Sequence, residues 1–223
     1  MEPREIESPW AHRVQIRHGL DVLEGSLTVP TGACGVVLFA HGSRSSRHSP
    51  RNRLVASVLN EARFATLLLD LQTAEEGRRE EPPAASLDIV LRAERLMAAT
   101  DWLAHEPLTA RLPVGYFGAS TGTGAALVAA ARRPDRVQAV VSRGGHPELA
   151  TEALPRVRAP TLLIVGEQDT TACELHRLAL CQMRVDAQLA VVVGATCRFE
   201  EPGALRVVAR LARDWFRRIL WSA

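Results

Sequence analysis

The chemistry that this sequence can support is centred on Ser120, which lies in Gly118-Ala-Ser-Thr-Gly122. A short apolar run over residues 114–117 precedes this motif and predicts a buried strand, and an alanine-rich segment of high helix propensity follows it. A G-x-S-x-G motif between a strand and a helix places the serine on a sharp turn with its hydroxyl exposed. The helix N-terminus beneath it carries free N–H groups and a partial positive charge, which favour an oxyanion. The motif therefore predicts a nucleophilic serine.

The same residues also fit a glycine pattern, Gly118-x-x-x-Gly122-x-Gly124, similar to the cofactor-binding glycines of short-chain dehydrogenases. That pattern normally follows the first strand of the fold, whereas here it follows about the fifth predicted strand. Those enzymes also use a Tyr-x-x-x-Lys pair, but this chain has a single tyrosine, Tyr116, inside the strand, and no lysine. The sequence therefore predicts no dinucleotide cofactor.

Composition narrows the functional classes further. The chain has 223 residues, 47% of them hydrophobic, which is enough for one globular domain over residues 1–223 with a full core. All 27 basic residues are arginine, which excludes a Schiff-base lysine and a P-loop lysine. They are interleaved with 25 acidic residues, and the net charge is +2. We therefore expect no nucleic-acid partner. The oligomeric state stays open.

The termini and the cysteines indicate a compartment. Residues 1–10 are polar and charged, without the apolar core of a signal peptide, and no apolar stretch approaches the roughly 18 residues of a membrane helix. Cys34, Cys173, Cys181 and Cys197 are scattered without C-x-x-C spacing. They are typical of free thiols in a reducing compartment, not of a disulfide or zinc framework. We expect a cytoplasmic protein with no metal and no membrane partner.

Hydrophobic patterning predicts strands that alternate with helices. Two short alternating runs, residues 14–18 and 23–29, predict an antiparallel hairpin. Further strands are predicted at residues 34–40, 65–71, 114–117, 137–142, 161–165 and 189–193, and helices at 51–64, 86–105, 171–183 and 204–220. This order predicts an α/β fold: a mostly parallel twisted sheet with the hairpin at one edge, helices on both faces and no large cap domain. The charged loop at 72–86 fits a lid over a site and a passive surface loop equally well.

Polar residues follow the predicted strands at their carboxyl ends, where parallel sheets place their chemistry. These are residues 41–43, Ser120, residues 143–146, Asp169 and Cys197. Because all of these ends lie at one edge of the sheet, we expect these residues on one side of the molecule.

Four stretches resemble the α/β-hydrolase superfamily and, within it, the dienelactone-hydrolase-like group. They are residues 38–43 (LFAHGS), 118–122 (GASTG), 160–169 (PTLLIVGEQD) and 194–203 (GATCRFEEPG), in that order. The resemblance covers about residues 14–220 and implies the α/β-hydrolase fold. It also implies hydrolysis through an acyl-enzyme.

The resemblance assigns roles to individual residues. It implies that Ser120 is the nucleophile, that Asp169 is the acid, and that the backbone N–H groups of Ser43 and Thr121 bind the oxyanion. It also implies a histidine in the loop after the last strand, but this chain has Cys197 at that position. The expected base is therefore missing, because a thiol beside a carboxylate is a poor proton acceptor.

Two other histidines are candidate substitute bases. His146 follows the strand next to the one that precedes Ser120, and His176 lies in the helix after Asp169. Both are on the expected side of the sheet, although an exposed surface histidine is the simpler interpretation of each. Four arginines near the expected mouth would suit an anionic acyl group, and ordinary solvated arginines explain them equally well: Arg44, Arg47, Arg143 and Arg198.

Two hypotheses of function follow. The first is a serine hydrolase that cleaves a small-molecule ester, thioester or lactone through an acyl-enzyme on Ser120. Dienelactone specificity does not carry over, because dienelactone hydrolases proper have cysteine in place of this serine. The second is a hydrolase-fold protein without useful turnover that binds a ligand or a partner protein.

Overall fold

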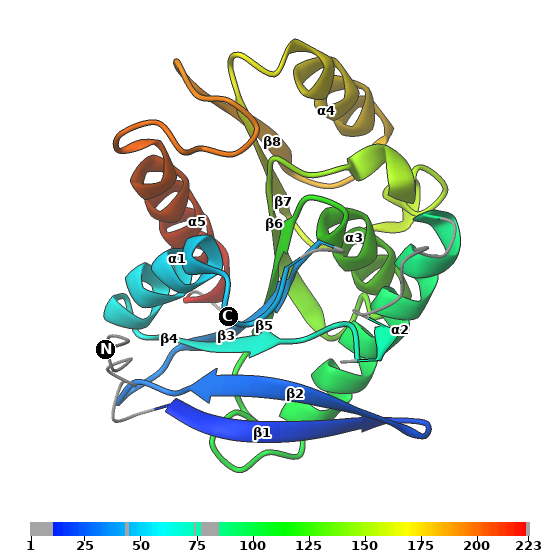
Figure 1. The fold of residues 1–223 in the computed structure, drawn as a ribbon, viewed down its shortest axis with the longest axis vertical. Coiled ribbons are helices and arrows are strands. Elements are labelled where there is room, and N and C mark those ends of the chain that lie inside the picture. Colours follow the sequence, from blue (N-terminus) through cyan, green and yellow to red (C-terminus); the bar gives the residue numbers. More distant parts are fainter. Residues whose placement is uncertain (1–10, 43–44, 74, 77–84, 222–223) are drawn as a thin grey trace.

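A computed structural model of the chain describes residues 11–42, 45–73, 75–76 and 85–221, the side chains of 85–87 excepted. Eight strands form one sheet in the order β1-β2-β4-β3-β5-β6-β7-β8 (Figure 1). Their bounds are β1 Ala11–His18, β2 Asp21–Thr28, β3 Gly35–Ala40, β4 Phe64–Leu69, β5 Val114–Ala119, β6 Val137–Arg143, β7 Thr161–Gly166 and β8 Ala187–Val192.

The sheet is antiparallel at one edge and parallel elsewhere. β1 pairs with β2, and β2 with β4, in antiparallel register, while β4, β3, β5, β6, β7 and β8 are mutually parallel. This confirms the predicted edge hairpin. It also confirms that the strand ends carrying polar residues share one edge of the sheet.

In the described part of the chain, five α-helices cover both faces of the sheet. α1 (Pro50–Glu61) and α5 (Ala204–Leu220) lie on one face, and α2 (Ala85–Leu103), α3 (Gly122–Arg132) and α4 (Thr170–Gln182) lie on the other (Figure 1). Two short 3₁₀ helices follow β6: η2 (Pro147–Ala150) and η3 (Leu154–Arg156). No helical cap domain is present among the described elements.

The central strands are apolar throughout because both of their faces are buried. In β5, Tyr116 packs into the core under α2 and α3, while Phe117 packs into the core under α1 and α5. Phe117 stacks against Phe39 of the neighbouring strand β3, with ring centroids 5.0 Å apart. The site at the end of β5 therefore rests on a rigid, fully buried strand.

Most element bounds agree with the sequence prediction, with informative shifts. The helix predicted over residues 51–64 ends at Glu61, because Arg63 adopts a left-handed φ of 66° and Phe64 already belongs to β4. The loop predicted over residues 72–86 lies mostly outside the described residues. No helix in the described part of the chain is both long and apolar enough to cross a membrane.

Candidate active site

The turn between β5 and α3 has the geometry that the sequence motif predicts. Ser120 adopts a φ of 54°, a left-handed conformation that is uncommon for a residue with a side chain, and Ser120 is exposed. A Cβ at Gly122 would lie 2.1 Å from the carbonyl oxygen of Ala40, and one at Gly118 would lie 2.7 Å from Cα of Thr123. Both motif glycines are therefore required by close backbone packing around the serine.

The loop after β3 lies against Ser120. A Cβ at Gly42 would lie 3.2 Å from Oγ of Ser120 and 3.3 Å from Oγ1 of Thr121. This proximity agrees with a role for the loop in binding an oxyanion. Thr121 precedes α3 at the expected position, while Ser43, the other predicted donor, lies outside the described residues.

His41 holds this loop in place from a buried position. Its Nδ1 donates to the carbonyl oxygen of Gly42 at 2.9 Å, and its Nε2 accepts from the N–H of Leu71 at 3.0 Å. Burial lowers the pKa of His41, in keeping with a neutral ring that donates at one nitrogen and accepts at the other. His41 therefore supports the loop and has no free nitrogen for base catalysis.

Arg92 of α2 braces the same loop, and sequence reasoning did not find it. This fully buried arginine donates from Nη1 to the carbonyl oxygen of His41 at 3.1 Å and pairs through Nε with Asp88 Oδ2 at 2.7 Å. The i, i+4 spacing of Asp88 and Arg92 is the only sequence signal for this pair, and it gives no hint of burial.

The loop after β8 packs against glycines at the ends of two neighbouring strands. A Cβ at Gly166 would lie 2.4 Å from the carbonyl oxygens of Ala195 and Thr196, and one at Gly144 would lie 2.8 Å from that of Cys197. The loop therefore crosses the carboxyl ends of β7 and β6. Cys197 is exposed there, so the thiol occupies the region in which a histidine was expected.

Asp169, the predicted acid, is the N-cap of α4. Its Oδ1 accepts a hydrogen bond from the N–H of Ala172 at 3.1 Å. This bond satisfies one of the free donors at the start of the helix. The carboxylate thus has a structural role whether or not it also takes part in chemistry.

A histidine–carboxylate pair lies beside the serine turn. The backbone N–H of His146 donates to the carbonyl oxygen of Ser120 at 3.2 Å, and His146 Nδ1 is 2.8 Å from Glu148 Oε1. The His146 side chain is 47% exposed. Sequence reasoning identified His146 but missed Glu148, although the His-x-Glu spacing after a strand end was available as a signal. The pair provides an imidazole that a carboxylate orients.

His176 is not a surface histidine, so the exposed alternative is wrong for this residue. It is fully buried, because Cys173, His176 and Ala179 form the buried face of α4. Its Nδ1 donates to the carbonyl oxygen of Ala172 at 2.7 Å, and its Nε2 is buried without a hydrogen-bond partner. Burial lowers the pKa of His176, while Glu148 and Asp169 act in the opposite direction. The ring therefore lies close to both carboxylates.

The four arginines expected at the mouth have different environments. Arg47 is paired with Asp70 and Glu24, and exposed Arg198 lies 3.8 Å from Glu200, while Arg44 falls outside the described residues. Arg143 has no hydrogen bond or ion pair with any described residue, although its Nη1 is buried. Arg143 is therefore the described member of this set without a partner.

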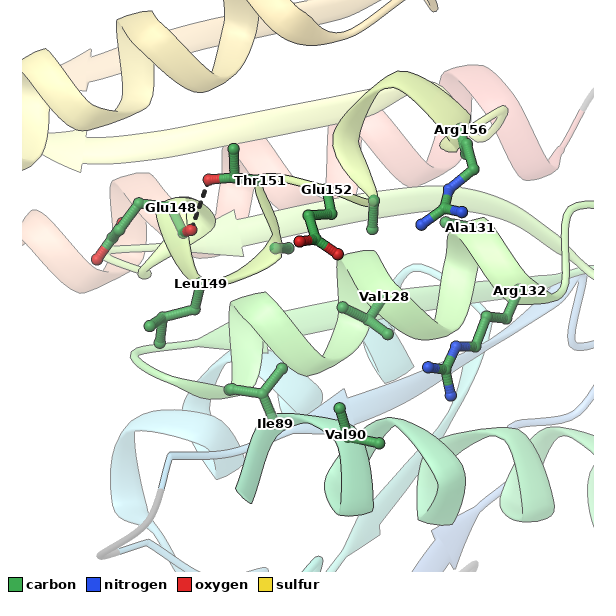
Figure 2. A pocket seen from close by; sticks show the side chains of 12 residues that line it. Ile89, Val90, Val128, Ala131, Arg132, Glu148, Leu149, Thr151, Glu152 and Arg156 are labelled. Atoms are coloured by element: carbon green, nitrogen blue, oxygen red, sulfur yellow. Dashed lines mark hydrogen bonds between the residues drawn. The ribbon is translucent and has the colours of Figure 1, made fainter. Parts of the chain in front are cut away.

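A cleft of about 580 Å³ lies beside the site, between α2, α3 and the η2–η3 segment. Figure 2 shows apolar side chains, among them Ile89, Val128 and Leu149, along its floor, and Arg132 and Arg156 at the end away from Glu148. The Glu148 side chain points away from the cleft in this view. Ser120 is not among the lining residues. Within the described ranges, no group of three or more His, Cys, Asp or Glu side chains is arranged to hold a metal ion.

Comparison with known proteins agrees with this geometry. The family model of the alpha/beta hydrolase fold matches residues 35–180. A dienelactone hydrolase from Anabaena variabilis has a structure with a TM-score of 0.91 and 55% identity, covering 94% of this chain and 98% of that one. Est1E from Butyrivibrio proteoclasticus shares the fold at a TM-score of 0.77 with 16% identity, covering 92% of this chain and 98% of that one.

A curated relative from Mycobacterium tuberculosis is 58% identical over 203 residues and carries the provisional name phosphoribosyl transferase. The match covers 91% of this chain but 45% of that protein. The chain thus spans about half the length of the curated relatives it matches, and their name describes the longer protein. The chain belongs to the α/β-hydrolase fold family, in its dienelactone-hydrolase-like group, because the family model matches it, its sheet has the corresponding strand order, and a dienelactone hydrolase has a similar structure.

Proposed function

We propose that this protein is a serine hydrolase that cleaves a small ester, thioester or lactone, with Ser120 as nucleophile and His146 as base. The observation that carries the proposal is the His146–Glu148 pair, 2.8 Å apart, on a loop hydrogen-bonded to the backbone of Ser120. Membership of a hydrolase family supports hydrolysis in general. The bond type and the residue roles belong to the proposal.

The first half of the reaction is acylation of the serine. Ser120 Oγ attacks the acyl carbon of the substrate while Nε2 of His146 takes the hydroxyl proton, and Glu148 stabilises the imidazolium through Nδ1. The negative charge on the carbonyl oxygen is received by backbone N–H groups, for which Thr121 and Ser43 are the family positions. Collapse of this intermediate breaks the bond to the leaving group, which receives the proton from His146.

The second half is hydrolysis of the acyl-enzyme. Water attacks the acyl carbon, His146 takes a proton from the water, and the ester bond to Ser120 breaks as Oγ regains its proton. In the described structure no hydrogen bond joins Ser120 Oγ to the ring of His146. The exposed ring therefore has to turn toward Oγ when substrate binds, as catalytic hydrogen bonds often tighten only in the complex.

Glu148, and not Asp169, is the orienting acid in this proposal. One oxygen of Asp169 caps α4, and the family position that Asp169 would orient is a thiol, Cys197. Glu148 has one oxygen on His146 Nδ1. This Nδ1–carboxylate pairing favours the tautomer that leaves Nε2 free to accept a proton.

The test combines covalent labelling with turnover of p-nitrophenyl acetate. We expect a fluorophosphonate probe to label the parent protein and not the Ser120→Ala variant. We expect His146→Ala to reduce turnover by about 10²- to 10⁴-fold, the usual contribution of general acid–base catalysis. His105→Ala is the matched control, because His105 is exposed at the end of α2 and bonded to Asp101.

The same test decides against the proposal in two ways. Labelling that is absent from neutral to alkaline pH would mean that Ser120 is not activated. It would favour the second hypothesis, a ligand- or partner-binding protein, which the exposed thiol at the expected histidine position supports. Equal turnover in His146→Ala and His105→Ala would reject His146 as the base even if Ser120 reacts.

A further inference from the structure

Arg143 extends from the middle of the carboxyl edge of the sheet. It is the last residue of β6 and pairs with Ala119, the residue immediately before Ser120, on one side and with Ile164 of β7 on the other. Its neighbour Gly144 packs against the backbone of Cys197. The guanidinium therefore originates between the serine turn and the β8 loop.

Arg143 lacks the partners that other buried arginines of this protein have. Arg92 pairs with Asp88 at 2.7 Å, and Arg95 pairs with Glu76 and Asp21, each at 2.6 Å. By contrast, no carboxylate in the described part of the chain pairs with Arg143, which is partly buried and has its Nη1 excluded from solvent without a hydrogen bond. That nitrogen has lost its hydration without gaining a partner, which is unfavourable for a charged group. An arginine that lacks a partner in this way and lies next to a proposed nucleophile is a candidate for binding an anionic ligand.

Arg51 is the charged group that repels Arg143. The nearby Arg51 of α1 is 3.3 Å from Glu200, which also lies 3.8 Å from Arg198, so one carboxylate faces two arginines. Glu201 of the same loop accepts from the N–H of Thr196. Burial, followed by repulsion from Arg51, lowers the pKa of Arg143 to about 10, so the group stays cationic at neutral pH.

We propose that Arg143 binds an anionic oxygen group, a carboxylate or a phosphate, on the substrate that reacts at Ser120. The planar guanidinium fork matches two oxygens of such a group and gives stronger hydrogen bonds than a neutral donor. Because Arg143 lies beside Ala119, a single substrate molecule can contact the guanidinium of Arg143 and react at Ser120. The assignment to a substrate rests on the proposed function, whereas the anion site itself does not.

The test measures anion binding without turnover. In a Ser120→Ala background, inorganic phosphate and glutarate are titrated separately by calorimetry, so that the two arms distinguish phosphate from carboxylate. We expect one of them to bind, and Arg143→Met to weaken that binding about 10- to 100-fold, the usual effect of losing a hydrogen bond to a charged group. Arg217→Met is the matched control and should bind like the background protein, because Arg217 is exposed at the end of α5, beside Trp221 and near Cys34 ahead of β3.

A stability measurement separates a binding role from a structural one. Because Arg143→Met removes an unpaired charge, we expect the ligand-free variant to melt at the same temperature as the parent or higher. Arg143→Gln serves as a second variant with the same expectation for binding. The proposal is overturned if neither anion binds the Ser120→Ala protein, if Arg143→Met binds as well as Arg217→Met, or if both Arg143 variants fail to fold. Failure of turnover with anion binding intact would reject the hydrolase proposal alone.

Discussion

The loops after β6 and β8 make opposite contributions to one site. The β8 loop packs over Gly144 and Gly166, and it presents the thiol of Cys197 at the position where the family resemblance implies a histidine. The β6 loop presents an imidazole and a carboxylate joined at 2.8 Å, and its backbone is bonded to Ser120. In the proposed mechanism, backbone geometry and proton-transfer chemistry are therefore separated between two loops.

This difference shows which parts of a hydrolase site depend on side-chain identity. The serine turn and the β8 loop are held by glycines and backbone packing, which tolerate a change at position 197. The base depends on one ring nitrogen and its partner, so it can be supplied from any loop at the same edge of the sheet. His146 and Glu148 meet that requirement from β6.

The largest expected effect is a gain of activity on returning the base to the β8 loop. In a His146→Ala background, we expect Cys197→His to raise p-nitrophenyl acetate turnover by about 10³-fold, within the range of general base catalysis. The imidazole would reach Ser120 from the family position. Cys197→Ser in the same His146→Ala background controls for removal of the thiol.

A folded Cys197→His protein with no gain on several short-chain esters would contradict this expectation. It would mean that the β8 loop no longer directs residue 197 toward Ser120. The β6 loop would then be the sole source of a base among the described residues of this edge.

The two carboxylates offer the next comparison. We expect Glu148→Gln to reduce turnover by about 10²-fold, because the amide no longer stabilises the imidazolium of His146. We expect Asp169→Asn to change turnover less than about tenfold, since its main role is as an N-cap, a position at which asparagine is also favoured. Steady-state kinetics on both variants measures the difference. A larger loss in Asp169→Asn than in Glu148→Gln would return the acid role to the family position.

Local sequence patterns predicted the parts of the site that depend on neighbouring residues. The G-x-S-x-G spacing predicted the turn at Ser120, because the motif requires glycine at the two positions, Gly118 and Gly122, where any Cβ would clash. The position of Asp169 followed from the end of an apolar run. Strand order confirmed that these ends share one edge.

Contacts between distant segments were not predictable in the same way. Arg92 reaches the carbonyl of His41 across 51 positions of sequence, and nothing local marks it as buried. His176 was interpretable as a surface residue until α4 was seen to bury the face that it shares with Cys173. Glu148 was overlooked because a carboxylate on a loop is ordinary until a ring nitrogen lies 2.8 Å away.

A glycine substitution separates the stability of the β8 loop from catalysis. A methyl group at Gly166 would lie 2.4 Å from two carbonyl oxygens of this loop, so Gly166→Ala should lower the free energy of unfolding by about 1–3 kcal/mol. If the base lies on the β6 loop, turnover below the unfolding temperature should change little. Urea unfolding and turnover on the same preparation check both statements. A collapse of turnover in a folded Gly166→Ala protein would mean that the β8 loop takes part in catalysis.

The smallest expected effect concerns His176, which lies close to Glu148 of the β6 loop and to Asp169 of the loop after β7. Burial lowers the pKa of His176 in the folded protein, whereas an unfolded chain titrates near about 6.5. Between these two pKa values the unfolded state binds more protons at this histidine than the folded state does. The contribution of His176 to the free energy of unfolding is therefore fully present above about pH 6.5 and is lost as the pH falls below it. The loss is bounded at about 1.4 kcal/mol per pH unit for one proton.

Urea unfolding of the parent and of His176→Gln at about pH 7.5 and about pH 5.5 measures this contribution. We expect the parent to lose more stability than His176→Gln between the two conditions, whatever the stability of the variant at the higher pH. His41, whose pKa is also lowered by burial, contributes equally to both proteins and cancels in the difference. An equal loss in both proteins would mean that His176 is protonated in the folded state, with the nearby Glu148 and Asp169 outweighing its burial. Its unpartnered Nε2 would then act as a donor to one of these carboxylates, and the loops after β6 and β7 would be coupled through this ring.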